Sequence, residues 1–246
     1  MRTSNPSLNS KTFERAAPGA GVMTIEGTVN KVGILLLLMV LPASYMWSRV
    51  LSAWEPSAAL GPAMLGLLGA FIFALITIFK KTWAPVTAPI YAVLEGLFLG
   101  GISAVFEAQF PGIAMQAIAL TMGTLFTLLL AYRSGLIKAT ENFKLGVVAA
   151  TGGIALLYLV NIVMGMFFGT RMAFIHEGGT VGILFSLFVV VIAALNLVLD
   201  FDFIENGAEM GAPKYMEWYA AFGLMVTLVW LYLEILRLLA KLQSRD

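Results

Sequence analysis

Four carboxylates behind a long uncharged stretch are the part of this sequence best suited to do chemistry. Asp200, Asp202, Glu205 and Glu209 directly follow residues 180–199, which are apolar and carry no charge. A carboxylate at the edge of hydrocarbon is costly unless water solvates it, a basic group pairs with it, or it binds a proton or a cation. The cluster therefore predicts an ion or proton site in which Asp200, Asp202 and Glu205 line an ion pathway or sense pH.

The spacing of the two aspartates limits how they can act together. If a helix continues through them, Asp200 and Asp202 point about 200° apart, so only one of them can face the interior of a bundle. Asn196 lies four residues before Asp200 and therefore on the same face. If the helix ends here instead, its dipole disfavours negative charge, and a proton or a cation would relieve that cost. A solvated, acidic helix end is the competing interpretation.

Charged residues inside other apolar stretches form a second candidate group. Glu95 lies near the middle of the apolar stretch 88–106, where a carboxylate must face the bundle interior or water. Glu234 and Arg237 are three residues apart, so they share a helix face and can pair locally. The alternative is that Arg237 pairs with Glu95. We expect these residues to form a buried charge pair that serves either helix packing or ion gating.

Composition excludes several classes of protein. The 246 residues are 60% hydrophobic and 12% charged, whereas soluble domains carry about 25% charged residues. The formal net charge of +1 gives no signature of nucleic-acid binding. One His and no Cys leave no disulfide, no thiolate catalysis and none of the usual zinc sites. Because hydrolase, metalloprotease and nucleotide-binding motifs are also absent, we do not expect an enzyme.

Seven apolar stretches are long enough to cross a bilayer, since a spanning helix needs about 20 residues. They cover residues 32–50, 58–79, 88–106, 113–132, 145–168, 180–199 and 215–239. The loops are short, so the sequence predicts an all-α integral membrane protein, a seven-transmembrane-helix bundle surrounded by the lipid bilayer.

The chain divides at the start of the first apolar stretch. We expect residues 1–30 to be a mobile polar tail, without the apolar core of a signal peptide, and residues 31–246 to be one transmembrane domain. Within that domain, Gly96 and Gly100 have the spacing that lets two helices approach closely.

The distribution of Lys and Arg predicts the orientation in the membrane. Basic residues gather in the tail and in the loops after the second, fourth and sixth stretches, whereas the opposite loops carry few. The N-terminus is therefore expected in the cytoplasm and, with seven spans, the C-terminus outside. Arg237, Lys241 and Arg245 argue mildly against the last step, and a re-entrant or miscounted span would bring the C-terminus inside.

Four pieces of the sequence, in this order and spacing, carry a family resemblance. They are residues 5–9 with 24–31, 91–104, 196–205 and 214–239. Together they resemble the Bax inhibitor-1/YccA (TMBIM) superfamily, in its bacterial Bax-inhibitor-1-like branch. The resemblance implies a seven-helix bundle with a central last helix, in the bacterial inner membrane, that leaks calcium in a pH-dependent manner.

The resemblance also implies which residues act. In the family, an aspartate at the end of the sixth span pairs with another in the seventh, and shared protonation opens or closes the path. The first aspartate maps onto Asp200 or Asp202, whose oxygens suit calcium. The second position falls near Thr227, which is not an acid. Either Glu217 or Glu234 replaces it, or the two aspartates suffice alone.

The family's acid–arginine latch is similarly incomplete in this chain. The resemblance implies that Arg237 contributes to it, and Glu95 is the acid we expect to face it, because the second apolar stretch contains no acid.

Three functions remain open from the sequence. The first is a pH-modulated cation leak with calcium or protons as the ions. The second is a non-transporting interaction protein that modulates a membrane protease or another membrane partner, which the missing acid and the polar tail favour. A secondary transporter ranks third, because it would need broken helices and an internal repeat, and neither is evident.

Overall fold

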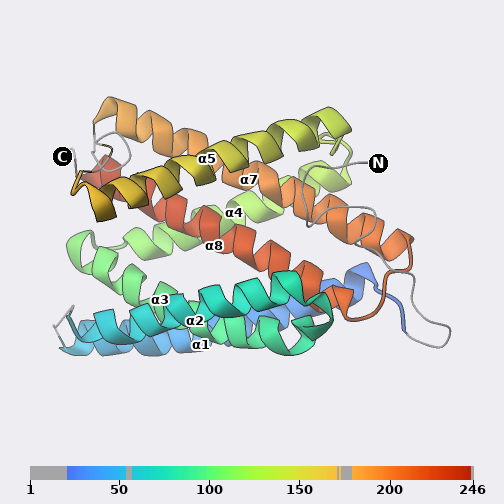
Figure 1. The fold of residues 1–246 in the computed structure, drawn as a ribbon, viewed down its shortest axis with the longest axis horizontal. Coiled ribbons are helices and arrows are strands. Elements are labelled where there is room, and N and C mark those ends of the chain that lie inside the picture. The colour runs from blue at the N-terminus through green and yellow to red at the C-terminus, as the bar shows by residue number, and fades with distance from the viewer. Residues whose placement is uncertain (1–20, 54–56, 171, 173–178, 245–246) are drawn as a thin grey trace. The chain divides into compact units, whose positions relative to one another are not determined.

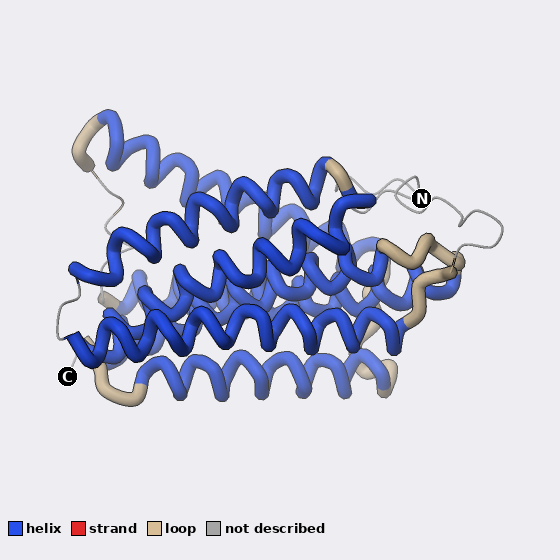
Figure 2. The backbone as a smooth tube through the Cα atoms, turned by 90° about the horizontal axis from the view of Figure 1, so that it is seen from below, coloured by secondary structure: helices blue, strands red, loops and turns tan. Residues whose placement is uncertain are grey.

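The structure, a computed structural model, describes residues 21–53, 57–170, 172 and 179–244. Within these ranges the chain consists of helices and short loops, with one isolated β-bridge and no strand (Figure 2). The helices are α1 (Ile25–Ala53), α2 (Ser57–Phe79), the 3-10 turn η2 (Lys81–Trp83), α3 (Ala84–Gln109), α4 (Ile113–Arg133), α5 (Glu141–Phe167), α7 (Thr180–Glu209) and α8 (Met216–Gln243). The seven α-helices are all long and apolar enough to cross a membrane, which confirms the predicted all-α fold.

Two helix boundaries differ most from those expected. α1 begins at Ile25, within the segment 1–30 expected to be a tail, of which residues 1–20 lie outside the described ranges. α7 continues to Glu209, so the acidic cluster lies within its last turns and not beyond its end. The chain then turns at Gly211, whose φ of 65° is the left-handed conformation that glycine commonly adopts after a helix.

The chain forms two compact units, and α7 and α8 contribute to both of them. Unit 1 comprises Met1–Ala114 and Asp202–Val226, and unit 2 comprises Met115–Phe201 and Thr227–Asp246. No loop marks the division along α7 and α8, because both crossing points lie inside continuous helices.

In unit 1, α3 packs against both α1 and α2, and Figure 1 shows these three helices side by side. Two glycines of α3 permit the close approach of α1. A Cβ atom on Gly96 would overlap the carbonyl oxygen of Met39, and one on Gly100 would overlap that of Ala43. The glycine spacing thus produces the close helix packing that it predicts.

In unit 2, α4 and α5 accompany the first part of α7 and the last part of α8. The buried Lys241, near the end of α8, donates to the Gly182 carbonyl at 3.0 Å and to the Ser186 hydroxyl at 2.9 Å, near the start of α7. α7 and α8 therefore run antiparallel in unit 2. Residues near Phe201 of α7 thus lie at the same level as residues near Thr227 of α8.

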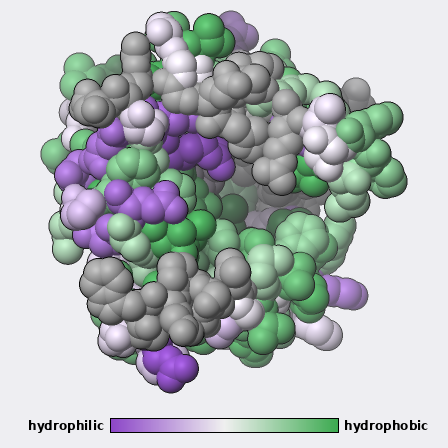
Figure 3. Space-filling view, turned by 90° about the vertical axis from the view of Figure 1, so that its left-hand side faces the viewer, coloured by the Kyte–Doolittle hydropathy of each residue, from purple (hydrophilic) through white to green (hydrophobic). Residues whose placement is uncertain are grey.

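α8 and α3 are the two most buried spans. In α8, 56% of the most apolar 18-residue window is buried, compared with 17% in α2 and in α5. Those helices expose large apolar side chains such as Leu65 and Phe167, at 71% and 74%. Figure 3 shows hydrophobic residues over much of one face, with hydrophilic residues gathered together. Such apolar surface requires lipid, so the chain is a multi-pass membrane protein.

Candidate functional site

Asp200 of α7 and Thr227 of α8 meet within unit 2. The Thr227 hydroxyl donates a hydrogen bond to the Asp200 carboxylate. The second carboxylate oxygen, Oδ2, is buried and has no hydrogen-bond partner among the described residues. A buried polar atom without a partner costs free energy. Among the described residues of unit 2, this oxygen is therefore a favourable point for a proton, a water molecule or a cation to bind.

A second polar contact lies one turn earlier on α7. Asn196 donates through Nδ2 to the Thr151 hydroxyl of α5 at 2.8 Å. Because four residues separate Asn196 from Asp200, the two side chains lie on the same helix face. We call Thr151, Asn196, Asp200 and Thr227 the carboxylate layer.

An apolar layer adjoins the carboxylate layer within unit 2. Ile154 of α5 forms a buried cluster with Val189 and Ile192 of α7, and Trp230 of α8 packs against it. On α7 and α8 these residues lie about one to three turns from the carboxylate layer. We call these four residues the apolar layer. Polar side chains on one side of it are thus separated from those on the other by packed hydrocarbon.

A charged group lies on the far side of the apolar layer along α8. Arg237 pairs with Glu234, with Nη1 2.8 Å from Oε1. The Tyr158 hydroxyl of α5 donates to Glu234 Oε1 at 2.9 Å and accepts from Arg237 Nη1 at 2.8 Å. Glu234 is 2% exposed and Arg237 40%. The arginine therefore neutralises a buried carboxylate while its own side chain reaches toward the surface.

The remaining candidates from the sequence lie in unit 1. Asp202 is half-buried and Glu205 is exposed, while Glu95 is 6% exposed inside α3. Because α7 is a continuous helix, Asp202 points about 200° away from Asp200. The pairing of Glu95 with Arg237 and the part of Asp202 and Glu205 in an ion pathway stay predictions.

The site offers few ligands for a metal ion. Within the described ranges, no three His, Cys, Asp or Glu side chains gather in a group that could hold a metal. Calcium takes roughly six to eight oxygen ligands, whereas the carboxylate layer provides one carboxylate, one amide and two hydroxyl groups. A calcium ion at Asp200 would therefore keep most of its water.

Sequence reasoning did not find the contacts of Tyr158 and Trp230. Both are residues that an apolar helix uses for packing, and the partners of Tyr158 lie 76 and 79 residues away. The family pattern puts an acid near Thr227, opposite the aspartate of the sixth span, and in the structure Thr227 is the hydrogen-bond partner of Asp200. The one available signal was a hydroxyl group at the position where an acid is expected.

The sequence matches a known protein family over almost its whole length. A family model described as "Bax inhibitor 1 like" matches residues 5–244. The chain therefore belongs to the Bax inhibitor 1 like family, which confirms the resemblance seen in its sequence. No curated protein and no solved structure gave a match.

Proposed function

We propose that this protein is a pH-modulated cation leak channel of the Bax inhibitor-1 type, with calcium as the permeant ion. The observation that carries the proposal is the buried, unpartnered Oδ2 oxygen of Asp200. A carboxylate oxygen at membrane depth is a favourable place for a proton or a cation. Membership of the Bax inhibitor 1 like family supports the same function.

The two protonation states of Asp200 would have different effects on a cation. An ionised carboxylate attracts calcium, while a protonated one is neutral and does not. Thr227 holds one carboxylate oxygen and thereby orients the other. With a hydroxyl group in place of a second acid, the pH response rests on one titrating carboxylate instead of a coupled pair.

The apolar layer is the barrier in this proposal. Packed hydrocarbon excludes water, and hydrophobic constrictions gate ion flow by losing their water. Trp230 is its largest side chain and packs against Ile154, Val189 and Ile192. A small displacement of α8 would open a path for water past this layer.

We place the protein in the bacterial inner membrane with a cytoplasmic N-terminus. Lys and Arg are enriched in the tail and in the loops after α2, α4 and α7, and such loops face the cytoplasm. With seven spans the C-terminus then lies outside.

A second candidate function is that of a non-transporting membrane interaction protein, for example one that modulates a membrane protease. The observation in its favour is Thr227. Because this position holds no acid, Asp200 lacks the second carboxylate of the pair that the family resemblance implies. This function predicts that the purified protein conducts no ions and that a partner remains bound to it in mild detergent.

Calcium flux into liposomes distinguishes the two functions. Purified full-length protein is reconstituted, and flux is followed with a trapped calcium dye from about pH 5 to about pH 8. The channel proposal predicts flux above protein-free liposomes that changes with pH. Flux equal to that of protein-free liposomes at every pH would refute the channel and favour the interaction protein.

A further inference from the structure

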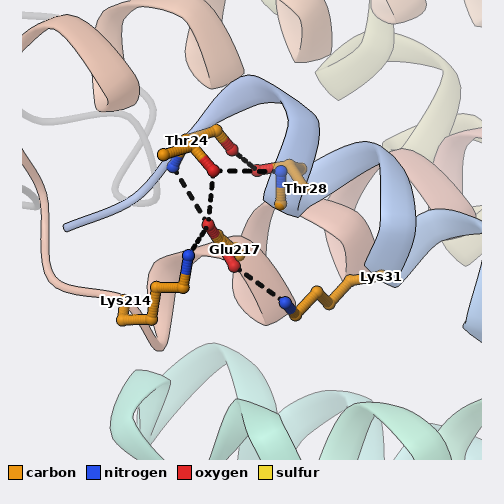
Figure 4. Close-up of polar contacts among 6 residues, drawn as sticks. Thr24, Thr28, Lys31, Lys214 and Glu217 are labelled. Carbon is orange, nitrogen blue, oxygen red and sulfur yellow. Dashed lines mark hydrogen bonds and ion pairs between the residues drawn. The ribbon is translucent and has the colours of Figure 1, made fainter. Parts of the chain in front are cut away.

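A buried carboxylate in unit 1 has no part in the carboxylate layer. Glu217, in the first turn of α8, is 0% exposed. Its Oε1 accepts from the Thr24 N–H at 3.0 Å, from the Thr24 hydroxyl at 2.9 Å and from Lys214 Nζ at 2.7 Å. Lys31 Nζ lies 2.9 Å from Oε2 in an ion pair. Figure 4 shows the carboxylate directed at Thr24, with one lysine on either side.

The start of α1 is shaped to receive this carboxylate. Thr24 caps the helix, because its hydroxyl accepts from the Gly27 N–H at 3.0 Å. Gly27 leaves the space for Glu217, since a Cβ atom there would overlap the carboxylate. Thr24, Gly27 and Lys31 are spaced by three and four residues, so they share one helix face. We call these three residues, with Lys214 and Glu217, the corner clasp.

Backbone hydrogen bonds reinforce the corner clasp. Val22 and Pro213 form an antiparallel β-bridge. The Met23 N–H donates to the Ala212 carbonyl at 2.7 Å, and the Lys214 N–H donates to the carbonyl of residue 21 at 3.0 Å. The start of α1 is therefore bound to the loop between α7 and α8 by backbone and side chains together.

The corner clasp contains both buried and exposed parts. The Glu217 carboxylate is fully buried, but the side chains of Lys31 and Lys214 are 22% and 53% exposed. Ion pairs near water are individually weak, whereas a buried carboxylate that loses its donors is strongly unfavourable. Loss of its donors would therefore leave the buried Glu217 carboxylate unpaired, which is unfavourable.

We propose that the corner clasp is a releasable latch on the last helix, and this rests on the channel function proposed above. When closed, it holds α8 in the position that blocks ion flow; when released, it lets α8 move and flux rises. α8 is continuous from Glu217 to Thr227, a distance of roughly 15 Å along its axis. A displacement of its first turn is therefore passed to the partner of Asp200 and to Trp230.

A disulfide between the two bridged residues tests the latch directly. The chain has no cysteine, so Val22→Cys with Pro213→Cys introduces one defined pair. Antiparallel bridge partners have Cα atoms about 4.5–5.5 Å apart, a separation that a disulfide accepts. Calcium flux is measured in liposomes before and after reduction, with loss of free thiols confirming the cross-link. We expect at least roughly fivefold lower flux in the oxidised protein than after reduction, the lower end of the usual coupling between two sites.

A charge variant tests the latch in the opposite direction. Glu217→Gln keeps the shape of the side chain but removes the charge that holds both lysines, so flux should rise. The matched control is Glu141→Gln, because Glu141 also pairs with a lysine three residues away at a helix start but is 58% exposed. Its flux should equal that of the unaltered protein.

The outcomes separate the latch from the channel. Flux that is equal in the cross-linked and reduced forms, or unchanged by Glu217→Gln, overturns the latch and leaves the channel in place. Absence of flux from every protein, the unaltered one included, overturns the channel and the latch with it.

Discussion

At the scale of single residues, the Thr227 hydroxyl occupies the place beside Asp200 where a second carboxylate is expected. Two neighbouring carboxylates would share a proton and titrate as a pair. Here Thr227 donates to one oxygen of Asp200 and leaves Oδ2 without a partner in the described part of the chain. The site keeps a single titrating group with a fixed orientation. A simple one-proton response is expected instead of a coupled one.

Removing the Thr227 hydroxyl should lower the stability of the folded protein. Thr227→Val preserves the volume of the side chain but removes the hydrogen bond to Asp200. We expect the free energy of unfolding to fall by about 0.5–1.5 kcal/mol. Thermal unfolding in mild detergent measures it. In the background of Asp200→Asn the same change should cost less, and equal losses in both backgrounds would show that the two residues are not coupled.

At the scale of secondary structure, the apolar stretches were sufficient to predict the seven helices. Their ends were harder to place, because polar residues continue α1 and α7 beyond the apolar segments. α1 starts at Ile25, where Thr24 provides the cap, and α7 runs through its acidic residues to Glu209. The contacts between Asp200 and Thr227 and around Glu217 join residues distant in sequence. Such contacts depend on packing, which no local pattern encodes.

The packing of α3 on α1 should be sensitive to one methyl group. Gly96→Ala would place a Cβ atom against the Met39 carbonyl, and such overpacking costs about 1–3 kcal/mol. Gly33→Ala is the matched control, because a Cβ atom at Gly33 meets nothing within 4 Å. Thermal unfolding should therefore show a lower Tm for Gly96→Ala only. Equal Tm values for the two variants would contradict this packing.

The apolar layer should behave as a barrier. Trp230→Ala removes its largest side chain, so water should enter and basal calcium flux should rise, by roughly threefold or more. Phe188→Ala is the control, because Phe188 lies on α7 but is 51% exposed. Liposome flux that is unchanged in Trp230→Ala would place the barrier elsewhere.

At the scale of the whole molecule, the chain is a Bax inhibitor 1 like multi-pass membrane protein, and its described residues form seven helices that are long and apolar enough to cross a membrane. Composition alone predicted a membrane protein, because so much apolar surface cannot be buried by a soluble fold. The division into two units was not predictable, since it crosses α7 and α8 inside continuous helices and no loop marks it.

Cysteine labelling tests the proposed orientation. The chain lacks native cysteine, so Leu136→Cys in the loop after α4 and Pro111→Cys in the loop after α3 report on opposite sides. With a cytoplasmic N-terminus, a membrane-impermeant maleimide should label Pro111→Cys in intact cells and Leu136→Cys only after permeabilisation. The reverse pattern would invert the orientation.

The central claim is that protonation of Asp200 controls cation flow. The most direct measurement is calcium flux in liposomes from about pH 5 to about pH 8 for the unaltered protein and Asp200→Asn, with Glu141→Gln as the control. Asn cannot ionise, so the variant should hold flux at the low-pH level of the unaltered protein at every pH, while the control keeps the full response. A pH response that survives in Asp200→Asn would contradict the claim.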